Sequence, residues 1–212
     1  MGVAERKERH KEELKGDILK AAKELFMEKG FEATSIRNIA EKIEYSPATV
    51  YLYYKDKDEI MHALHQEGFK MLVDYFTPLY TIAQPFERLK ALGNAYIKFS
   101  LDHPEMYKLI FVMEEPMDHV ANCKDETWDE GEGAYDVLFN TVAQCQQAGY
   151  FTQLETHGLS FTIWSTMHGL CTLRSSGHLG HVAEAKNIRP DTDSTMMYAY
   201  ETFVKLLEAL KK

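Results

Sequence analysis

Apolar side chains recur at spacings of three and four residues along most of the chain, whereas the strict alternation typical of a strand is scarce. Such spacings place side chains on one face of an α-helix. The first stripe consists of Leu14, Ile18, Ala21, Ala22, Leu25 and Phe26. It predicts an amphipathic helix over about residues 12–29, which Gly30 ends because glycine adopts the left-handed cap conformation without strain. We therefore expect an all-α protein.

Two short amphipathic segments follow within residues 34–57, which read TSIRNIAEKIEYSPATVYLYYKDK. The first segment begins after an N-cap at Thr34 or Ser35. Its apolar face consists of Ile36, Ile39, Ala40 and Ile43. After a tight turn, Ser46 caps the second segment and Pro47 occupies its first turn, where a missing amide hydrogen costs nothing. This arrangement predicts a helix-turn-helix, whose second helix presents its N-terminal end to the major groove of DNA.

The remaining stripes predict helices over about residues 56–76, 86–102, 104–113, 132–148, 157–176 and 192–211. Between two of them, residues 114–133 carry many carboxylates and are expected to form a long acidic loop.

The charge of the chain is unevenly distributed around a formal net charge of −9. Residues 1–57 hold 12 Lys and Arg against 11 Asp and Glu, a balance of +1, so the remainder carries −10. The acidic total therefore does not argue against DNA binding, because local Lys and Arg supply phosphate contacts. Because there is no run of about 18 apolar residues and no apolar signal core, we expect a cytoplasmic protein without a membrane anchor.

Catalytic and cofactor-binding motifs are missing from the sequence, which contains no GxSxG, P-loop, GxGxxG or HExxH. Cys123, Cys145 and Cys171 are scattered and odd in number, which disfavours both a disulfide framework and a zinc site. A metal site at His103, His119 and Cys123 is the weaker alternative. We expect a protein without enzyme activity, cofactor or metal.

The stretch over about residues 14–62 closely resembles the TetR (tetracycline-repressor) family of bacterial regulators. The resemblance rests on ILKAAKELFMEKGFEATSIRNIA, on SPATVY with its Ser-x-x-Thr-x-Tyr spacing, and on YYKDKDEI. The turn before the second short helix departs from the family pattern at Tyr45, and the start of that helix departs at Pro47 and Ala48. These departures leave the preferred base sequence open.

The resemblance implies a set of DNA contacts. The implied residues are Thr34, Ser35, Arg37, Ser46, Pro47, Ala48, Thr49, Tyr51, Tyr53 and Lys55. Arg37 and Lys55 are expected at phosphates. Tyr51 and Tyr53 are expected at phosphates or thymine methyls, although without the resemblance they are equally well interpreted as surface aromatics. Lys57 is interpreted either as a solvated charge at the start of a helix or as a further DNA contact.

For the rest of the chain, the resemblance implies a helical regulatory domain with an internal ligand pocket and a homodimer interface. We expect a DNA-binding domain over residues 1–57 and an effector-binding and dimerisation domain over residues 58–212. Trp164, His168 and Gly169 fit a Trp-x-x-x-His-Gly pattern of such domains. His168 is interpreted either as a polar anchor in the pocket or as a structural histidine, and Gly169 is expected to allow close packing of another helix.

Aromatic residues crowd the C-terminal part, and a subset is expected to line an apolar pocket with few polar anchors. The ligand-binding candidates are Tyr96, Phe99, Phe111, Tyr135, Phe139, Trp164 and His168. The implied effector is a hydrophobic or aromatic small molecule with hydrogen-bonding capacity. The candidate dimer contacts are Phe161, Trp164, Ser165, His168, Thr172, Arg174, Met197, Tyr200, Glu201, Val204 and Leu207.

These features favour a DNA-binding transcriptional repressor that reads a palindromic operator as a homodimer. Repression is the expected direction because blocking polymerase requires only occupancy of the operator. Ligand binding is expected to favour a dimer whose recognition helices no longer match adjacent major grooves. The alternatives are a helical protein-interaction module, which would not bind a palindromic duplex, and an activator without a small-molecule ligand.

Overall fold

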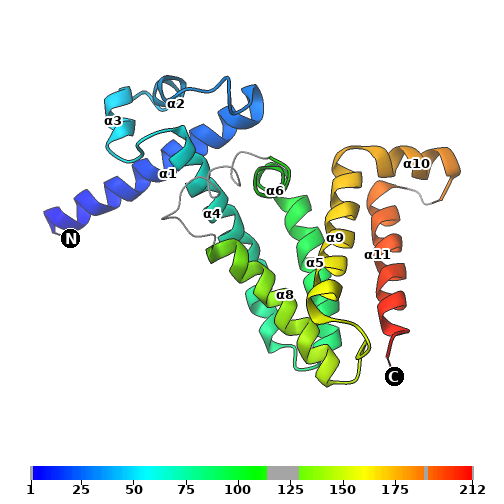
Figure 1. Cartoon of the computed structure of the whole chain (residues 1–212). Coiled ribbons are helices and arrows are strands. Elements are labelled where there is room, and N and C mark those ends of the chain that lie inside the picture. Colours follow the sequence, from blue (N-terminus) through cyan, green and yellow to red (C-terminus); the bar gives the residue numbers. More distant parts are fainter. Residues whose placement is uncertain (1, 114–128, 189–190, 212) are drawn as a thin grey trace. The chain divides into compact units, whose positions relative to one another are not determined.

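The computed structural model describes residues 2–113, 129–188 and 191–211. Within these ranges the chain is helical apart from turns and an isolated β-bridge between Tyr150 and Lys211, which confirms the all-α prediction (Figure 1). None of the described helices combines the length and the apolarity needed to span a bilayer.

The helices are α1 (Val3–Lys29), α2 (Ile36–Lys42), α3 (Pro47–Tyr51), α4 (Lys57–Phe76), α5 (Pro85–Asp102), α6 (Pro104–Phe111), α8 (Asp129–Gln147), α9 (Thr156–Ser175), α10 (His178–Lys186) and α11 (Thr192–Glu208). A 3-10 helix, η1 (Thr77–Thr81), lies between α4 and α5.

These helices divide into two compact units. Among the described residues, the N-terminal unit comprises residues 2–69 and 105–113, and the C-terminal unit comprises residues 70–104, 129–188 and 191–211. Helix α4 contributes to both, whereas α1, α2 and α3 lie entirely in the N-terminal unit. The functional boundary predicted after residue 57 stays a prediction.

The N-terminal unit is built on the apolar stripe of α1, which packs against α2. Ile18 of α1 and Ile39 of α2 are fully buried, and a buried Val50 anchors the short helix α3. Phe26 and Phe31 pack their rings with centroids 5.1 Å apart where the chain turns from α1 towards α2. The predicted helix-turn-helix is therefore present and rests on the predicted stripe.

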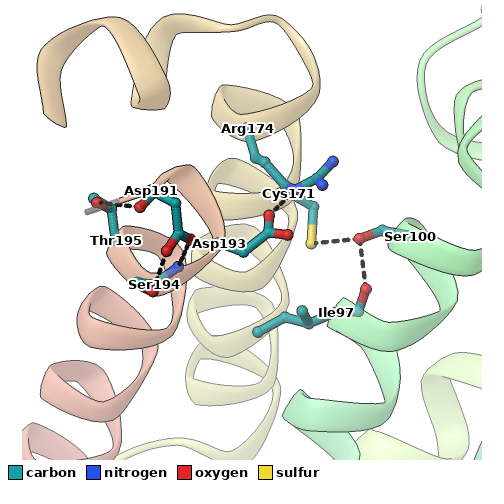
Figure 2. Close-up of polar contacts among 8 residues, drawn as sticks. All are labelled: Ile97, Ser100, Cys171, Arg174, Asp191, Asp193, Ser194 and Thr195. Atoms are coloured by element: carbon teal, nitrogen blue, oxygen red, sulfur yellow. Dashed lines mark hydrogen bonds and ion pairs between the residues drawn. The ribbon is translucent and has the colours of Figure 1, made fainter. Parts of the chain in front are cut away.

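The C-terminal unit is centred on α5, against which α8 and α9 pack. Helix α11 packs against α9 and approaches α5 closely at Gly93, where an added Cβ would lie 2.7 Å from the ring of Tyr200. Polar contacts join the same helices: Ser100 Oγ of α5 donates to Cys171 Sγ of α9 at 3.3 Å (Figure 2). Arg174 Nε of α9 donates to Asp193 Oδ1 of α11 at 2.6 Å.

Two helix starts differ from the predictions. Helix α1 begins at Val3 and not near residue 12, because Lys, Arg and Glu favour helices and pairs such as Arg9–Glu13 stabilise exposed turns. Helix α8 begins at Asp129 and not near residue 132. In both places the helix extends beyond its apolar stripe, so the stripe alone marks its start too late.

Helix α10 is absent from the predicted set. It is short and lies between two residues in the left-handed conformation, Gly177 at its start and Asn187 at its end. So few turns give no clear apolar periodicity. Of the predicted acidic loop, residues 114–128 lie outside the described residues.

Candidate DNA-binding surface and regulatory unit

A reciprocal cap fixes the start of α2. The backbone N–H of Asn38 donates to Ser35 Oγ at 3.2 Å, and the backbone N–H of Ser35 donates to Asn38 Oδ1 at 3.0 Å. Of the two predicted caps, Ser35 is therefore correct. Thr34 is buried, and its hydroxyl donates to the carbonyl of Gly30 at 2.8 Å, which ties α2 to the end of α1. The side chain of Thr34 is thus held away from the surface.

Arg37 lies on the exposed side of α2. Its Nε donates to Glu41 Oε1 at 2.9 Å, and the two side chains are 78% and 59% exposed. An ion pair so open to water contributes little to stability, so the guanidinium can exchange Glu41 for a phosphate at small cost.

Helix α3 is held at its start by a cap and on its inner side by an anchor. Ser46 Oγ accepts from the backbone N–H of Thr49 at 3.2 Å, and the two hydroxyl oxygens are 3.0 Å apart. Pro47 occupies the first turn as predicted, and Val50 is fully buried. Before the cap, Glu44 turns the chain with a positive φ of 61°. The short helix is therefore positioned before any DNA binds.

The outer surface of α3 is more apolar than the predicted contacts indicate. The exposed residues at its N-terminal end are Tyr45, Ser46, Pro47 and Ala48. Beyond them Tyr51 is 56% exposed and Leu52 is 81% exposed, whereas Tyr53 is half-buried. Tyr54 packs inward, and burial together with Glu59 raises the pKa of its phenol to about 12. Leu52 is not among the predicted DNA contacts. The one feature of the sequence that indicates its exposure is the helical spacing, which directs Leu52 away from the buried Val50.

The start of α4 carries two lysines with different roles. Lys55 is exposed, and Asp56 Oδ1 caps the start of α4 by accepting from the backbone N–H of Glu59 at 2.8 Å. Lys57 is not the solvated charge that the sequence indicated: its Nζ donates to the carbonyl of Phe31 at 3.1 Å and lies 4.1 Å from the centre of that ring. Lys57 therefore joins α4 to the turn after α1, and Lys55 keeps its side chain on the surface.

Two predicted ligand residues meet between α5 and α9. Tyr96 Oη lies 3.4 Å from His168 Nδ1, and Thr172 Oγ1 lies 3.4 Å from His168 Nε2. Burial lowers the pKa of His168, which favours the neutral imidazole. This arrangement fits a structural histidine as well as a polar anchor. Phe99 is fully buried elsewhere and packs edge-on against Tyr75, with centroids 5.6 Å apart.

Three further predicted ligand residues, Tyr135, Phe139 and Trp164, belong to one aromatic cluster on α8 and α9. His157 joins it by stacking on Phe139 with centroids 4.4 Å apart, and its Nδ1 lies 2.8 Å from Tyr135 Oη. Phe161 stacks on Tyr135 with centroids 5.2 Å apart and is 52% exposed, so the cluster reaches the surface.

The seventh predicted residue, Phe111, belongs to the N-terminal unit, where it packs edge-on against Phe69 with centroids 5.3 Å apart. The C-terminal unit contains an apolar cavity of about 20 Å³ between α5, α9 and α11, which is too small for more than a water molecule. An open groove of about 720 Å³ lies between α5 and α11. Neither hollow is lined by any of the seven predicted residues, so the predicted ligand pocket stays a prediction.

Helices α9 and α11 both expose apolar side chains. Those exposed side chains include Phe161, Leu173, Tyr198 and Leu206. Two of the predicted dimer contacts are wrong: Tyr200 and Leu207 are buried within their own chain, because Tyr200 packs on Gly93 of α5 and Leu207 lines the cavity shared with that helix. At Gly169 an added Cβ would meet nothing within 4 Å, so that part of α9 has room for another helix.

Metal-binding groups are not evident in the part of the chain that the structure describes, where no three His, Cys, Asp or Glu side chains gather around a common point. His103 lies with its Nε2 3.1 Å from Tyr75 Oη. The other two residues of the alternative metal site, His119 and Cys123, lie outside the described residues, so that alternative is not tested.

Family comparisons match both parts of the chain. Residues 18–64 match the family of bacterial regulatory proteins of the tetR type, and residues 89–188 match the tetracyclin repressor-like C-terminal domain. The HTH-type transcriptional regulator YfiR of Bacillus subtilis is 36% identical over 59 residues, which are 28% of this chain and 29% of YfiR. The transcriptional activator FasR of Mycolicibacterium smegmatis is 29% identical over 102 residues, or 48% and 47% of the two chains. The chain thus matches less than half the length of these curated relatives.

Solved structures share the fold over nearly the whole chain. The fatty acid degradation regulator FadR from Bacillus halodurans superposes with a TM-score of 0.68 at 19% identity, covering 90% of this chain and 94% of FadR. A tetR-family regulatory protein from Rhodococcus RHA1 gives a TM-score of 0.67 at 21% identity, covering 91% and 96%. Together, the two family matches and the shared fold show that the chain belongs to the TetR family of bacterial regulatory proteins.

Proposed function

We propose that the protein is a transcriptional repressor that binds a palindromic DNA operator as a homodimer and releases it when a small molecule binds the C-terminal unit. The observation that carries this proposal is the recognition helix α3, capped by Ser46 and anchored by Val50. A helix fixed in this way presents its N-terminal end to the major groove without a cost of ordering.

Phosphate contacts are proposed for residues before and after α3 in the sequence. Arg37 supplies a planar guanidinium that can exchange its exposed pair with Glu41 for a phosphate. Lys55 supplies an exposed ammonium at the start of α4, and Ser35 lies at the N-terminal end of α2, where amide dipoles favour an anion. Thr34 acts as a positioning residue because its hydrogen bond to Gly30 fixes that end.

Base recognition is proposed to rely on apolar contact. Pro47, Ala48 and Leu52 are exposed and carry no hydrogen-bonding group on their side chains. The hydroxyls of Ser46 and Thr49 already contact each other. Apolar side chains in the major groove recognise the C5-methyl group of thymine. We therefore expect half-sites rich in A·T pairs, with Tyr51 and Tyr53 donating from their hydroxyls to phosphates.

Dimerisation is proposed through α9 and α11. Phe161 and Leu173 expose apolar surface on α9, and the open space at Gly169 between them lets a second helix approach closely. Two-fold symmetry would pair this face with itself and double the number of bases read. The contacts predicted at Ser165 and Thr172 remain part of this proposal.

The effector is proposed to be a hydrophobic or aromatic molecule that binds the C-terminal unit. Tyr96 with His168 offers a polar anchor, and the aromatic cluster of Tyr135, Phe139 and Trp164 offers stacking surface. An activator is the second candidate function, because FasR, one of the matching relatives, is a transcriptional activator.

Selection of duplexes from a randomised pool with the full chain tests DNA binding. A palindrome with A·T-rich half-sites is expected, bound by a dimer in light scattering at micromolar concentration. Lys55→Gln should lower the slope of log affinity against log salt by about one unit per chain, because one phosphate contact is lost. Lys20→Gln removes the same charge from an exposed position of α1 and should leave the slope unchanged.

Failure to enrich any sequence contradicts the proposed function, and an unchanged slope for Lys55→Gln contradicts that phosphate contact. Transcription in vitro from a promoter overlapping the selected palindrome separates repressor from activator. A screen of apolar compounds for thermal stabilisation, followed by release of the duplex, tests the effector. A stabilising compound that leaves DNA affinity unchanged removes the proposed coupling.

A further inference from the structure

Helix α1 extends well beyond the core that it helps to build. It begins at Val3, whereas the match to the family begins at residue 18, and from residue 5 onwards its first buried side chain is Leu14. Residues 5–13 are all exposed. Figure 1 shows these first turns running out past the other helices of the N-terminal unit.

Basic side chains continue the apolar stripe of α1 into this extension. Lys7 and Lys11 precede Leu14 and Ile18 at spacings of four, three and four residues, so all four lie on one face of the helix. The acidic residues of the extension lie off this stripe. They are Glu5, Glu8, Glu12 and Glu13. The nearly neutral extension therefore carries a cationic stripe on one side.

The direction of the cationic stripe follows from the packing of α1. Leu14 and Ile18 are buried on the face of α1 that packs into the N-terminal unit, which contains α2 and α3. Because Lys7 and Lys11 continue that line, they point to the side of α1 that carries the helix-turn-helix. Residues on the opposite face, such as Arg9 and Lys20, point away from it.

We propose that Lys7 and Lys11 bind phosphates of the duplex that flanks the bases read by α3. This inference rests on the proposed function, since it needs a DNA molecule seated on the helix-turn-helix. Residues 5–13 extend about 13 Å at 1.5 Å per residue, which corresponds to about four base pairs of duplex. The partner is the DNA backbone, because ammonium groups on a hydrated surface recognise phosphate without regard to sequence.

The ion pair of Lys11 is weak enough to be exchanged for a phosphate. Lys11 Nζ lies 3.7 Å from Glu8 Oε1, and the side chains are 50% and 68% exposed. A pair of this kind contributes little in water, whereas each phosphate contact releases condensed counterions from the duplex. Exchange of Glu8 for phosphate is therefore favourable once DNA is bound.

The test compares two double variants of the full chain on two duplexes. Lys7→Gln/Lys11→Gln removes both cations of the stripe, and Arg9→Gln/Lys20→Gln removes two cations from the opposite face. Glutamine retains the helix propensity, and far-UV circular dichroism checks the helix content. One duplex carries the selected palindrome with ten flanking base pairs on each side, and the other carries the palindrome alone.

On the long duplex, Lys7→Gln/Lys11→Gln is expected to weaken binding about tenfold and to lower the salt slope by about two units per chain. Arg9→Gln/Lys20→Gln is expected to bind like the wild type. On the trimmed duplex, the wild type should lose most of its advantage over Lys7→Gln/Lys11→Gln.

Equal losses in both double variants, or no loss in either, overturn the inference while wild-type binding still supports the proposed function. If circular dichroism shows that the wild-type chain is folded and it binds neither duplex, the proposed function and this inference both fail.

Discussion

The recognition helix α3 and the polar contacts between helices of the C-terminal unit are fixed in different ways. At α3 the fixing contacts are local: Ser46 caps Thr49, three residues away. In the C-terminal unit they are remote: Tyr96 contacts His168 and Ser100 contacts Cys171, each more than 70 residues away. A local site can be inferred from spacing in the sequence, whereas a remote one cannot.

The difference also separates the two functions. Local caps give the DNA-binding surface its shape from its own sequence, so it needs no signal from elsewhere to form. Contacts between α5, α9 and α11 join helices whose packing the proposed effector is expected to change, because each contact depends on where a second helix lies. A substitution can therefore disrupt helix α3 and leave the helix contacts of the C-terminal unit intact, or the reverse.

The largest effect is expected from Val50→Asp. Val50 is fully buried, and a carboxylate there has no partner, so the N-terminal unit should lose roughly 4 kcal/mol or more of unfolding free energy. Binding to the selected duplex should disappear, while light scattering should still show the dimer that the C-terminal unit is proposed to form.

Leu52→Asp is the matched control, two residues further on and 81% exposed. It should change the unfolding free energy by no more than about 0.5 kcal/mol and weaken DNA binding through repulsion of phosphate. Normal folding and DNA binding by Val50→Asp would remove Val50 as the anchor of α3.

The contrast between local and remote contacts also explains which features of the structure can be predicted from the sequence. Ser46 and Pro47 are recognised as a helix start because cap preferences act within one turn. The contact of Lys57 is not predictable from the sequence, because its partner, the carbonyl of Phe31, is 26 residues away and becomes its neighbour only in the folded chain.

In the C-terminal unit, apolar stripes predicted helices but not which face meets which helix. The apolar stripe therefore predicts Tyr200 as a dimer contact, although Tyr200 is buried against Gly93 of its own chain. The same limit applies to the predicted ligand residues, which the structure distributes among the Tyr96–His168 contact, the aromatic cluster, the Phe99 core and the N-terminal unit.

The second-largest effect expected is a loss of unfolding free energy at low pH. His65 on α4 is 1% exposed, and burial, followed by the neighbouring charge of His62, lowers its pKa to about 4. A histidine in the unfolded chain titrates near 6.5. The stabilising effect of the neutral form is therefore complete above about pH 6.5 and is lost as the pH falls towards 4, by roughly 3 kcal/mol.

Urea unfolding between pH 7 and pH 4 measures this loss in the N-terminal unit. His65→Leu should flatten the pH dependence, and His10→Gln, at an exposed position of α1, should leave it as in the wild type. If His65→Leu loses stability with acid as steeply as the wild type does, the burial of His65 is not the cause.

The smallest effects separate fold from assembly within the C-terminal unit. Gly93→Ala places a Cβ 2.7 Å from the ring of Tyr200 and should destabilise the unit by about 1–3 kcal/mol, because α5 and α11 must move apart.

Gly169→Ala meets nothing within 4 Å in its own chain and should stabilise helix α9 by up to about 1 kcal/mol. If α9 forms the dimer, that added methyl group lies in the interface, so dimer dissociation measured by analytical ultracentrifugation should become easier although each chain is more stable. A variant that gains stability and dimerises as tightly as the wild type would show that the second helix approaches elsewhere, and would move the interface to the apolar face around Tyr198 and Leu206 of α11.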